Sequence, residues 1–505
     1  MVAAVVNVGQ VLEPAVERVP ERTALVVGDR RCSYAELERW VRRVATALRS
    51  RGVGPGDRVA LVDNGSVLSV ATILAAARVG AASAQMNVLL TPDELGKLVT
   101  TVDARVGVAG EPFRAGLAEA LGADAVLGED DVAAGMDDSE APDADAATDA
   151  AVDADADALV LFTSGTTGLP KPIAIGHGVV DVRLRYYAAP VEPDAPPVVD
   201  MMTAPIFHIG GTLGLLVSLH SGRTIVLLPR FDAGAWLEAV ERHRVSRTFM
   251  VPTMLQRILD HPDFPARDLG SLEQISYGAA AAPVALVERA LDALPHVEFM
   301  NVFGQTETLG AYAALGADDH RARRKLGSAG TPLPGVEVRI VDVATEQDCP
   351  AGTVGQVWVR AAQNVTADWL RTGDLATLDD EGYLHPVGRM TDTINRGGEK
   401  FGPIEVEEVL RSHPAVRDAG VCGVPDPELG QRVAAVVVTV DGRALDPDDL
   451  RTFAARRLAR FKLPERIVFA DDLPYSNLGK VSRPALAAVI DGHGDADGHG
   501  HEGTR

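Results

Sequence analysis

The sequence is poor in cysteine, in aromatic residues and in positive charge. Its three cysteines, Cys32, Cys349 and Cys422, lie far apart and form no CxxC pair. The sequence therefore excludes a disulfide framework and fits a protein of the reducing cytoplasm. The net charge of −23 disfavours non-specific binding to nucleic acids or to anionic membranes.

No uninterrupted hydrophobic run is long enough to cross a membrane. The longest apolar stretch, 67–90, is interrupted by Arg78 and Gly80 and predicts a buried helix and strand. The N-terminus is apolar but has no basic segment, and Glu13 interrupts it, so no signal peptide is expected. We therefore expect a cytoplasmic protein without a membrane span.

The 505 residues exceed the size of one core, so the length predicts at least two domains. Acidic residues concentrate at 129–157, which contains twelve of them and no Lys or Arg, as is typical of a solvated loop or linker. The tail, 491–505, is rich in Gly, His and Asp and predicts a disordered end, with a loose metal site as the alternative.

Helix and strand patterns alternate along most of the chain. Ser33 and Glu36 predict a capping box for a helix over 34–51, followed by a strand over 58–62. Strands separated by helices predict parallel sheets, in which ligands collect at the carboxyl ends of the strands. Three residues follow apolar runs and could share one such rim: Thr163, Gly278 and Gly304.

The pattern changes after about residue 335. Strands over 335–343 and 355–360 predict a β-meander, and Gly388-Arg389 precedes a small α+β unit. We expect an α/β protein with a large N-terminal domain, 1–388, of parallel and mixed sheets flanked by helices. A small C-terminal α+β domain, 389–490, would follow it.

The most informative segment is Thr-Ser-Gly-Thr-Thr-Gly-Leu-Pro-Lys at 163–171. An apolar strand pattern runs into it, and its glycines, hydroxyls and single lysine are typical of a loop that binds polyphosphate. An ordinary turn is the alternative. Because the lysine is three residues past Gly168, the spacing does not fit a P-loop, so ATP would be bound in another fold.

Further motifs follow in a fixed order. They are 205–211 (PIFHIGG), 277–280 (YGAA), 301–308 (NVFGQTET), 371–375 (RTGDL), 388–389 (GR), 397–400 (GGEK) and 479–480 (GK). With the segment at 163–171, this series over about residues 10–490 resembles the AMP-forming adenylating enzymes. That superfamily contains acyl-CoA synthetases, adenylation domains and luciferases, and the chain is most similar to fatty or aryl acid–CoA ligases.

The resemblance implies that the small C-terminal domain is mobile and closes over the large one. It also implies a reaction in two steps. A carboxylate attacks the α-phosphate of ATP to give an acyl-adenylate and pyrophosphate, and a thiol then takes the acyl group. Since carboxylate and triphosphate repel each other, positioning and charge neutralisation should supply most of the catalysis. ATP, Mg²⁺ and coenzyme A, or the phosphopantetheine of a separate carrier protein, are the implied cofactors and partners.

The resemblance also assigns residues to the nucleotide. Glu307 would hold Mg²⁺, and Thr306 would donate to the α-phosphate. Asp374 would accept hydrogen bonds from the ribose hydroxyls, and Arg389 would anchor the ribose, with a domain-junction salt bridge as its alternative. The remaining nucleotide-binding residues are Thr163, Ser164, Gly165, Thr166, Thr167 and Lys171 at the β- and γ-phosphates, Gly278, Ala279, Ala280 and Gly304 close to the nucleotide, and Asn301 and Phe303 at adenine.

Lys480 is the residue to which the resemblance assigns the chemistry, because its ammonium would bridge the substrate carboxylate and the α-phosphate. His208 would line the acyl pocket, or be structural. Small residues at Gly210, Gly211, Ala279 and Gly310 suggest a medium or long acyl chain or an aryl acid.

The chain departs from the family pattern at Pro172 and Thr391 and in a short 360–372 segment, which bear on the second step. Gly398 lies in a segment that resembles a pantetheine tunnel and favours a thiol acceptor. An acid–CoA ligase is thus the leading hypothesis. The alternatives are a stand-alone enzyme that loads a carrier protein, an unusual adenylating enzyme such as a nitrite-activating diazo-forming one, and a non-catalytic nucleotide-binding protein. The oligomeric state, monomer or homodimer, stays open.

Overall fold

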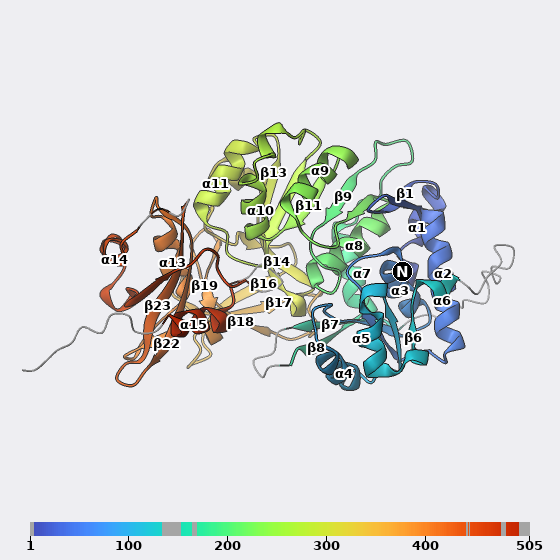
Figure 1. Cartoon of the computed structure of the whole chain (residues 1–505), viewed down its shortest axis with the longest axis horizontal. Helices are drawn as coiled ribbons and strands as arrows, with labels where there is room; N and C mark the ends of the chain where they lie inside the picture. The colour runs from blue at the N-terminus through green and yellow to red at the C-terminus, as the bar shows by residue number, and fades with distance from the viewer. Residues whose placement is uncertain are drawn as a thin grey trace, which may run out of the picture.

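The computed structural model describes residues 5–133, 153–163, 169–440, 443, 445–475 and 481–493. Two large sheets with helices between them form the bulk of the chain, and a meander and a smaller C-terminal unit follow (Figure 1). No described helix combines the length and the apolar character that crossing a membrane requires.

The largest sheet has nine strands in the order β15-β14-β13-β12-β11-β9-β10-β1-β2. Its central strands run parallel, whereas β2, β14 and β15 are antiparallel to their neighbours. The strands are β1 (Thr23–Val27), β2 (Arg30–Ser33), β9 (Val199–Met202), β10 (Thr224–Leu227), β11 (Arg247–Met250), β12 (Gln274–Gly278), β13 (Glu298–Gln305), β14 (Gly310–Leu315) and β15 (Thr331–Pro332).

Side chains that alternate along these strands face two different layers. One face packs on α9 (Ala233–His243), α10 (Pro252–Leu259) and α11 (Val284–Ala293) through a core that includes Trp236 and Tyr277. The other face looks toward α8 (Ile209–Ser221). The cavity described below lies on this second side.

The second sheet has six strands in the order β6-β5-β3-β4-β7-β8, and only the pair β7–β8 is antiparallel. Helix α3 (Val67–Arg78) is buried from Val67 to Ala77 because one core joins it to both large sheets. The strands are β3 (Arg58–Val62), β4 (Ala82–Gln85), β5 (Val106–Ala109), β6 (Val126–Leu127), β7 (Asp157–Thr163) and β8 (Lys171–Gly176). The remaining helices of this part are α1 (Glu13–Arg18), α2 (Tyr34–Ser50), α4 (Pro92–Thr101), α5 (Glu111–Leu121), α6 (Glu129–Ala133) and α7 (His177–Tyr187).

The C-terminal part begins after an antiparallel meander of β16 (Glu337–Val341), β17 (Gly355–Arg360), β18 (Leu370–Leu378) and β19 (Leu384–Arg389). Its own sheet has the order β21-β20-β23-β22, with β24 on β23, and it lies beside the meander (Figure 1). Its elements are β20 (Ile394–Arg396), β21 (Glu399–Phe401), α13 (Pro403–Arg411), β22 (Val416–Asp426), β23 (Gly430–Thr439), α14 (Pro447–Ala455), β24 (Arg466–Phe469) and α15 (Arg483–Gly492).

The α/β architecture expected from the sequence is confirmed, including the capping box at Ser33 and Glu36. The acidic segment is ordered at its edges, because α6 occupies 129–133, where Glu129 pairs with Arg30 at 2.6 Å. The start of the tail, 491–492, belongs to α15. Residues 134–152 and 494–505 lie outside the described residues. The predicted acidic loop and the predicted disordered tail therefore stay predictions over most of their length.

Candidate active site

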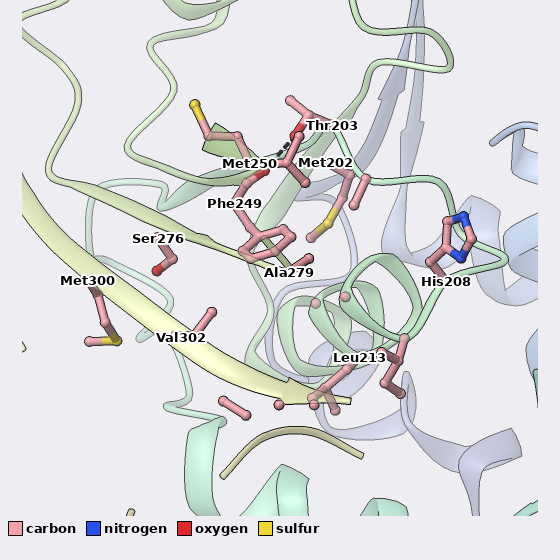
Figure 2. Close-up of a pocket in the computed structure, with 18 of the residues that line it drawn as sticks. Met202, Thr203, His208, Leu213, Phe249, Met250, Ser276, Ala279, Met300 and Val302 are labelled. Carbon is pink, nitrogen blue, oxygen red and sulfur yellow. Dashed lines mark hydrogen bonds between the residues drawn. The ribbon is translucent and has the colours of Figure 1, made fainter. Parts of the chain in front are cut away.

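A cavity of about 1350 Å³ lies between α8 and the nine-stranded sheet, and the ends of both large sheets border it. Figure 2 shows Phe249, Ser276 and Val302 side by side on neighbouring strands, with Leu213 of α8 near them. The candidate residues that line this cavity are Thr163, His208, Ala279, Gly304, Thr306, Glu307 and Arg389. Residues from 163 to 389 thus meet around one space.

The expectation that Thr163, Gly278 and Gly304 share the rim of a single sheet is wrong. Thr163 ends β7 of the six-stranded sheet, whereas Gly278 and Gly304 belong to β12 and β13 of the nine-stranded sheet. Thr163 and Gly304 still line the same cavity, because the two sheets present their strand ends to it.

Glycine is required at two positions beside the cavity because the backbone approaches closely. A Cβ atom on Gly278 would lie 2.2 Å from the carbonyl oxygen of Val302, and one on Gly304 would lie 1.9 Å from that of Gly310. Ala279, between these close contacts, has a left-handed φ of 65°. Such strain in a non-glycine residue is common where a binding site fixes the backbone.

Thr306 and Glu307 form a short 3-10 turn directly after β13. Its position is fixed by the backbone N–H of Val365, which donates to the carbonyl of Glu307 at 3.0 Å. Both side chains border the cavity. Among the described residues no cluster of three or more His, Cys, Asp or Glu could hold a metal. A cation here would therefore take one carboxylate, that of Glu307, and complete its oxygen ligands from phosphate and water, as Mg²⁺ commonly does.

Arg183 of α7 holds the segment that follows this turn. Its guanidinium donates to the carbonyls of Leu309 at 2.9 Å, of Thr308 at 3.0 Å and of Ala311. Arg183 is 2% exposed, and burial lowers the pKa of its guanidinium. The turn with Thr306 and Glu307 is thereby tied to the helix that follows the β7–β8 hairpin.

Asp374 and Arg389 are cross-strand neighbours on β18 and β19. Arg389 Nε lies 3.0 Å from Asp374 Oδ1, and the Asp374 side chain is only 10% exposed. The two residues assigned to the ribose thus form an ion pair, with Arg389 also lining the cavity. By the boundary expected from the sequence, Arg389 is the first residue of the C-terminal domain, so this ion pair also fits the alternative of a salt bridge at the domain junction.

We expect Asp374→Ala to raise the KM for ATP by about 10²-fold, because two hydrogen bonds to a charged acceptor would be lost. Burst measurements of pyrophosphate release against ATP concentration check this result. Asp380→Ala, at an exposed position two residues after β18, is the control and should leave KM unchanged. An unchanged KM in Asp374→Ala would contradict the ribose assignment.

Other predicted nucleotide residues lie beside the cavity but do not line it. Asn301 donates its side-chain amide to the carbonyl of Ser328 at 3.0 Å. Phe303 packs edge-on against Tyr312, with ring centroids 5.2 Å apart. Burial, and secondarily the charge of Asp374, raises the pKa of Tyr312 well above its usual range, so its hydroxyl stays protonated. Gly278 and Ala280 also lie outside the lining, so the roles of these residues at the nucleotide stay predictions.

The phosphate segment is described only at its ends. Thr163 and Lys171 are paired in the β7–β8 hairpin, and the Lys171 side chain is exposed. Ser164, Gly165, Thr166 and Thr167 lie outside the described residues, as does Lys480. Tyr475 and Val481, which flank the segment with Lys480, form a β-bridge.

Gly398 lies at the exposed tip between β20 and β21, where it and Gly397 have φ values of 94° and 60°. Positive φ at both residues is what a two-residue hairpin turn requires. Gly398 does not line the cavity, so its place in a pantetheine tunnel stays a prediction.

His208 is the residue that precedes α8, and it borders the cavity with its ring tilted against Phe207. Of the small residues that suggested room, Gly210, Ala279 and Gly310 do line the cavity. Gly211 does not line it. A Cβ at Gly211 would lie 2.2 Å from the carbonyl oxygen of Pro205, so glycine is needed there for backbone packing.

Sequence reasoning missed the cavity floor, which two rows of cross-strand neighbours form. The middle row consists of Met202, Phe249, Ser276 and Met300, and the distal row of Asp200, Arg247, Gln274 and Glu298. Alternation along each strand is a signal for one face, but the partners across strands come from separate parts of the chain.

Comparisons with known proteins agree with this geometry. The family model described as AMP-binding enzyme matches residues 12–367, and that described as AMP-binding enzyme C-terminal domain matches residues 405–480. Feruloyl-CoA synthase of an Amycolatopsis species is 36% identical over 92% of this chain and 94% of that protein. Indoleacetate–CoA ligase of Aromatoleum aromaticum is 33% identical over 93% and 96%. The structure of the amide bond synthetase McbA from Marinactinospora thermotolerans superposes with a TM-score of 0.85 at 29% identity, over 95% of this chain and 99% of that one.

Proposed function

Because this chain belongs to the AMP-binding enzyme family, we propose that it is an AMP-forming acid–CoA ligase. The observation that carries the proposal is the meeting of Thr163, Thr306, Glu307 and Arg389 around one cavity that continues between α8 and the sheet. Hydroxyl and carboxylate groups at one end, with a mainly apolar stretch beyond them, suit the joining of an acid to a nucleotide. The identity to named CoA ligases supports this activity.

The first step would be adenylate formation. The hydroxyls of Thr163 and its neighbours, with Lys171, would hold the β- and γ-phosphates, and Thr306 would donate to the α-phosphate. Mg²⁺ on Glu307 would neutralise phosphate charge, and Lys480 would hold the incoming carboxylate against the α-phosphate. The acid oxygen then bonds to phosphorus as the bond to pyrophosphate breaks. Electrostatic stabilisation of this kind is commonly the largest contribution to such a rate.

The second step would transfer the acyl group to the thiol of coenzyme A, with AMP as the leaving group. We propose that the C-terminal part, with Gly398 at an exposed hairpin tip, borders the path of the thiol. The similarity to an amide bond synthetase gives an amine as a second candidate acceptor. A carrier-protein thiol is a third, and it would need a separate protein partner.

A screen for pyrophosphate release tests the function directly. Purified protein is given ATP, Mg²⁺ and a panel of aliphatic, aryl and amino acids. Coenzyme A, a carrier protein with a free phosphopantetheine thiol, or an amine is then added as the acceptor. We expect pyrophosphate and AMP with at least one acid, and a thioester only with coenzyme A. No AMP with any acid would overturn the proposed function, whereas AMP with transfer only to an amine would replace the acceptor.

A further inference from the structure

The distal row of the cavity is polar, although the middle row that precedes it is mainly apolar. Asp200, Arg247, Gln274 and Glu298 are in register across β9, β11, β12 and β13. All four line the cavity, on the same face of the sheet as Phe249 and Ser276. An acyl chain that passes the middle row would therefore end among hydrogen-bonding groups.

Asp200 has one carboxylate oxygen that is satisfied and one that is not. Its Oδ2 accepts hydrogen bonds from Ser218 Oγ at 2.5 Å and from Arg223 Nη1 at 3.3 Å. Its Oδ1 is buried and has no hydrogen-bond partner within the described part of the chain, and the residue is only 6% exposed. A buried acceptor without a donor is costly, so a ligand or water that donates to it is expected.

Arg247 lies opposite Asp200 on the neighbouring strand, and it has a donor that lacks an acceptor. Its Nε is buried and lacks a hydrogen-bond partner in the described structure, although Glu273 Oε2 lies 4.0 Å from it. One hydroxyl could donate to Asp200 Oδ1 and accept from Arg247 Nε, because a hydroxyl is both donor and acceptor. An ammonium only donates, and a carboxylate only accepts. Asp200 already has a counter-charge in Arg223, and Arg247 has one in Glu273, so a neutral group suits the position between them best.

The length of α8 gives the distance from the end of the cavity near His208 to Asp200. Gly210, near His208, and Ser218, which bonds Asp200, are eight residues apart, which is about 12 Å along a helix. A saturated chain of ten carbons spans about 11 Å, since each 1.5 Å bond of a zigzag advances about 1.25 Å. The cavity therefore matches an extended acid of about this length.

We propose that the substrate is a slender carboxylic acid with a hydroxyl group about ten carbons from its carboxyl group, and that Asp200 and Arg247 bind this hydroxyl. This inference rests on the proposed function and specifies the acid. Ser276, between Phe249 and Met300 in the middle row, borders the path of the chain (Figure 2).

The test compares matched acids in the pyrophosphate assay. We expect 10-hydroxydecanoic acid to exceed decanoic, 10-aminodecanoic and decanedioic acid by about tenfold or more in kcat/KM, because its hydroxyl meets a charged acceptor. In Asp200→Asn the ratio of kcat/KM for 10-hydroxydecanoic acid to that for decanoic acid should fall below about twofold. Binding of the two acids, followed by calorimetry without ATP turnover, should show the same loss.

A second pair of variants tests whether the acyl chain runs past Ser276, in the middle row of the cavity. Ser276→Leu should lower the ratio of kcat/KM for ten-carbon acids to that for butanoic acid by about 10²-fold, since the added side chain would fill the middle of the cavity. Ser276→Ala is the matched comparison, and this ratio should fall far less there, because alanine adds no volume. Equal rates for decanoic and 10-hydroxydecanoic acid in the wild type, or an advantage that persists in Asp200→Asn, would overturn the inference. Failure to form AMP with every acid would instead remove the proposed function.

Discussion

Replacing Lys480 by alanine should lower the rate of adenylate formation by about 10²- to 10³-fold while ATP binding stays measurable. The reason is electrostatic, because two anions must meet in the first step and a single ammonium would lie between them. Pyrophosphate release measures the rate, and calorimetry with ATP measures binding. Transfer from a preformed adenylate to coenzyme A should be much less affected, since that step brings no carboxylate against a triphosphate.

The control for this result is Lys97→Ala, which removes an exposed lysine that pairs with Asp93 on the same helix, α4. It should leave both steps unchanged. Near-normal pyrophosphate release in Lys480→Ala would refute the role given to Lys480. An equal loss in both steps would show that the variant disturbs the C-terminal part as a whole.

Glu307→Gln should lower the rate of pyrophosphate release by about 10²-fold and raise the Mg²⁺ concentration needed for half of the maximal rate. The amide keeps the shape of the side chain but loses the charge that Mg²⁺ prefers. A titration of Mg²⁺ at saturating ATP separates the two effects, since excess metal should restore part of the rate.

Glu337→Gln is the matched control, because Glu337 lies on the meander in an exposed pair with Arg360. Its Mg²⁺ requirement should equal that of the wild type. If Glu307→Gln lost activity without any change in the Mg²⁺ requirement, Glu307 would position the turn instead of holding the metal.

Local patterns predicted most of the secondary structure. The capping box of α2 depends on residues three apart, and β3 and β17 occupy the ranges expected from the sequence. Periodicity and turn residues act over short distances, so one sequence suffices to find them. The motif series extended this to the family, which the comparisons confirm.

The floor of the cavity could not be predicted in the same way. Asp200, Ser218 and Arg223 belong to β9, α8 and the residue before β10, and they meet only because α8 packs back on the strand that precedes it. The division of the rim between two sheets is equally non-local, since β7 and β13 lie more than a hundred residues apart. Tertiary packing, which no single stretch of sequence records, decides both features.

The guanidinium of Arg183 bears on which parts of the chain could move relative to one another. By donating to the carbonyls of Thr308, Leu309 and Ala311, it fastens the turn that carries Glu307 to α7, and α7 follows directly on β8 of the β7–β8 hairpin. The two parts of the proposed triphosphate site should then move as one body. Any rearrangement for the thiol step would fall to the part of the chain beyond Arg389, and the geometry around the phosphates would be inherited unchanged from one step to the next.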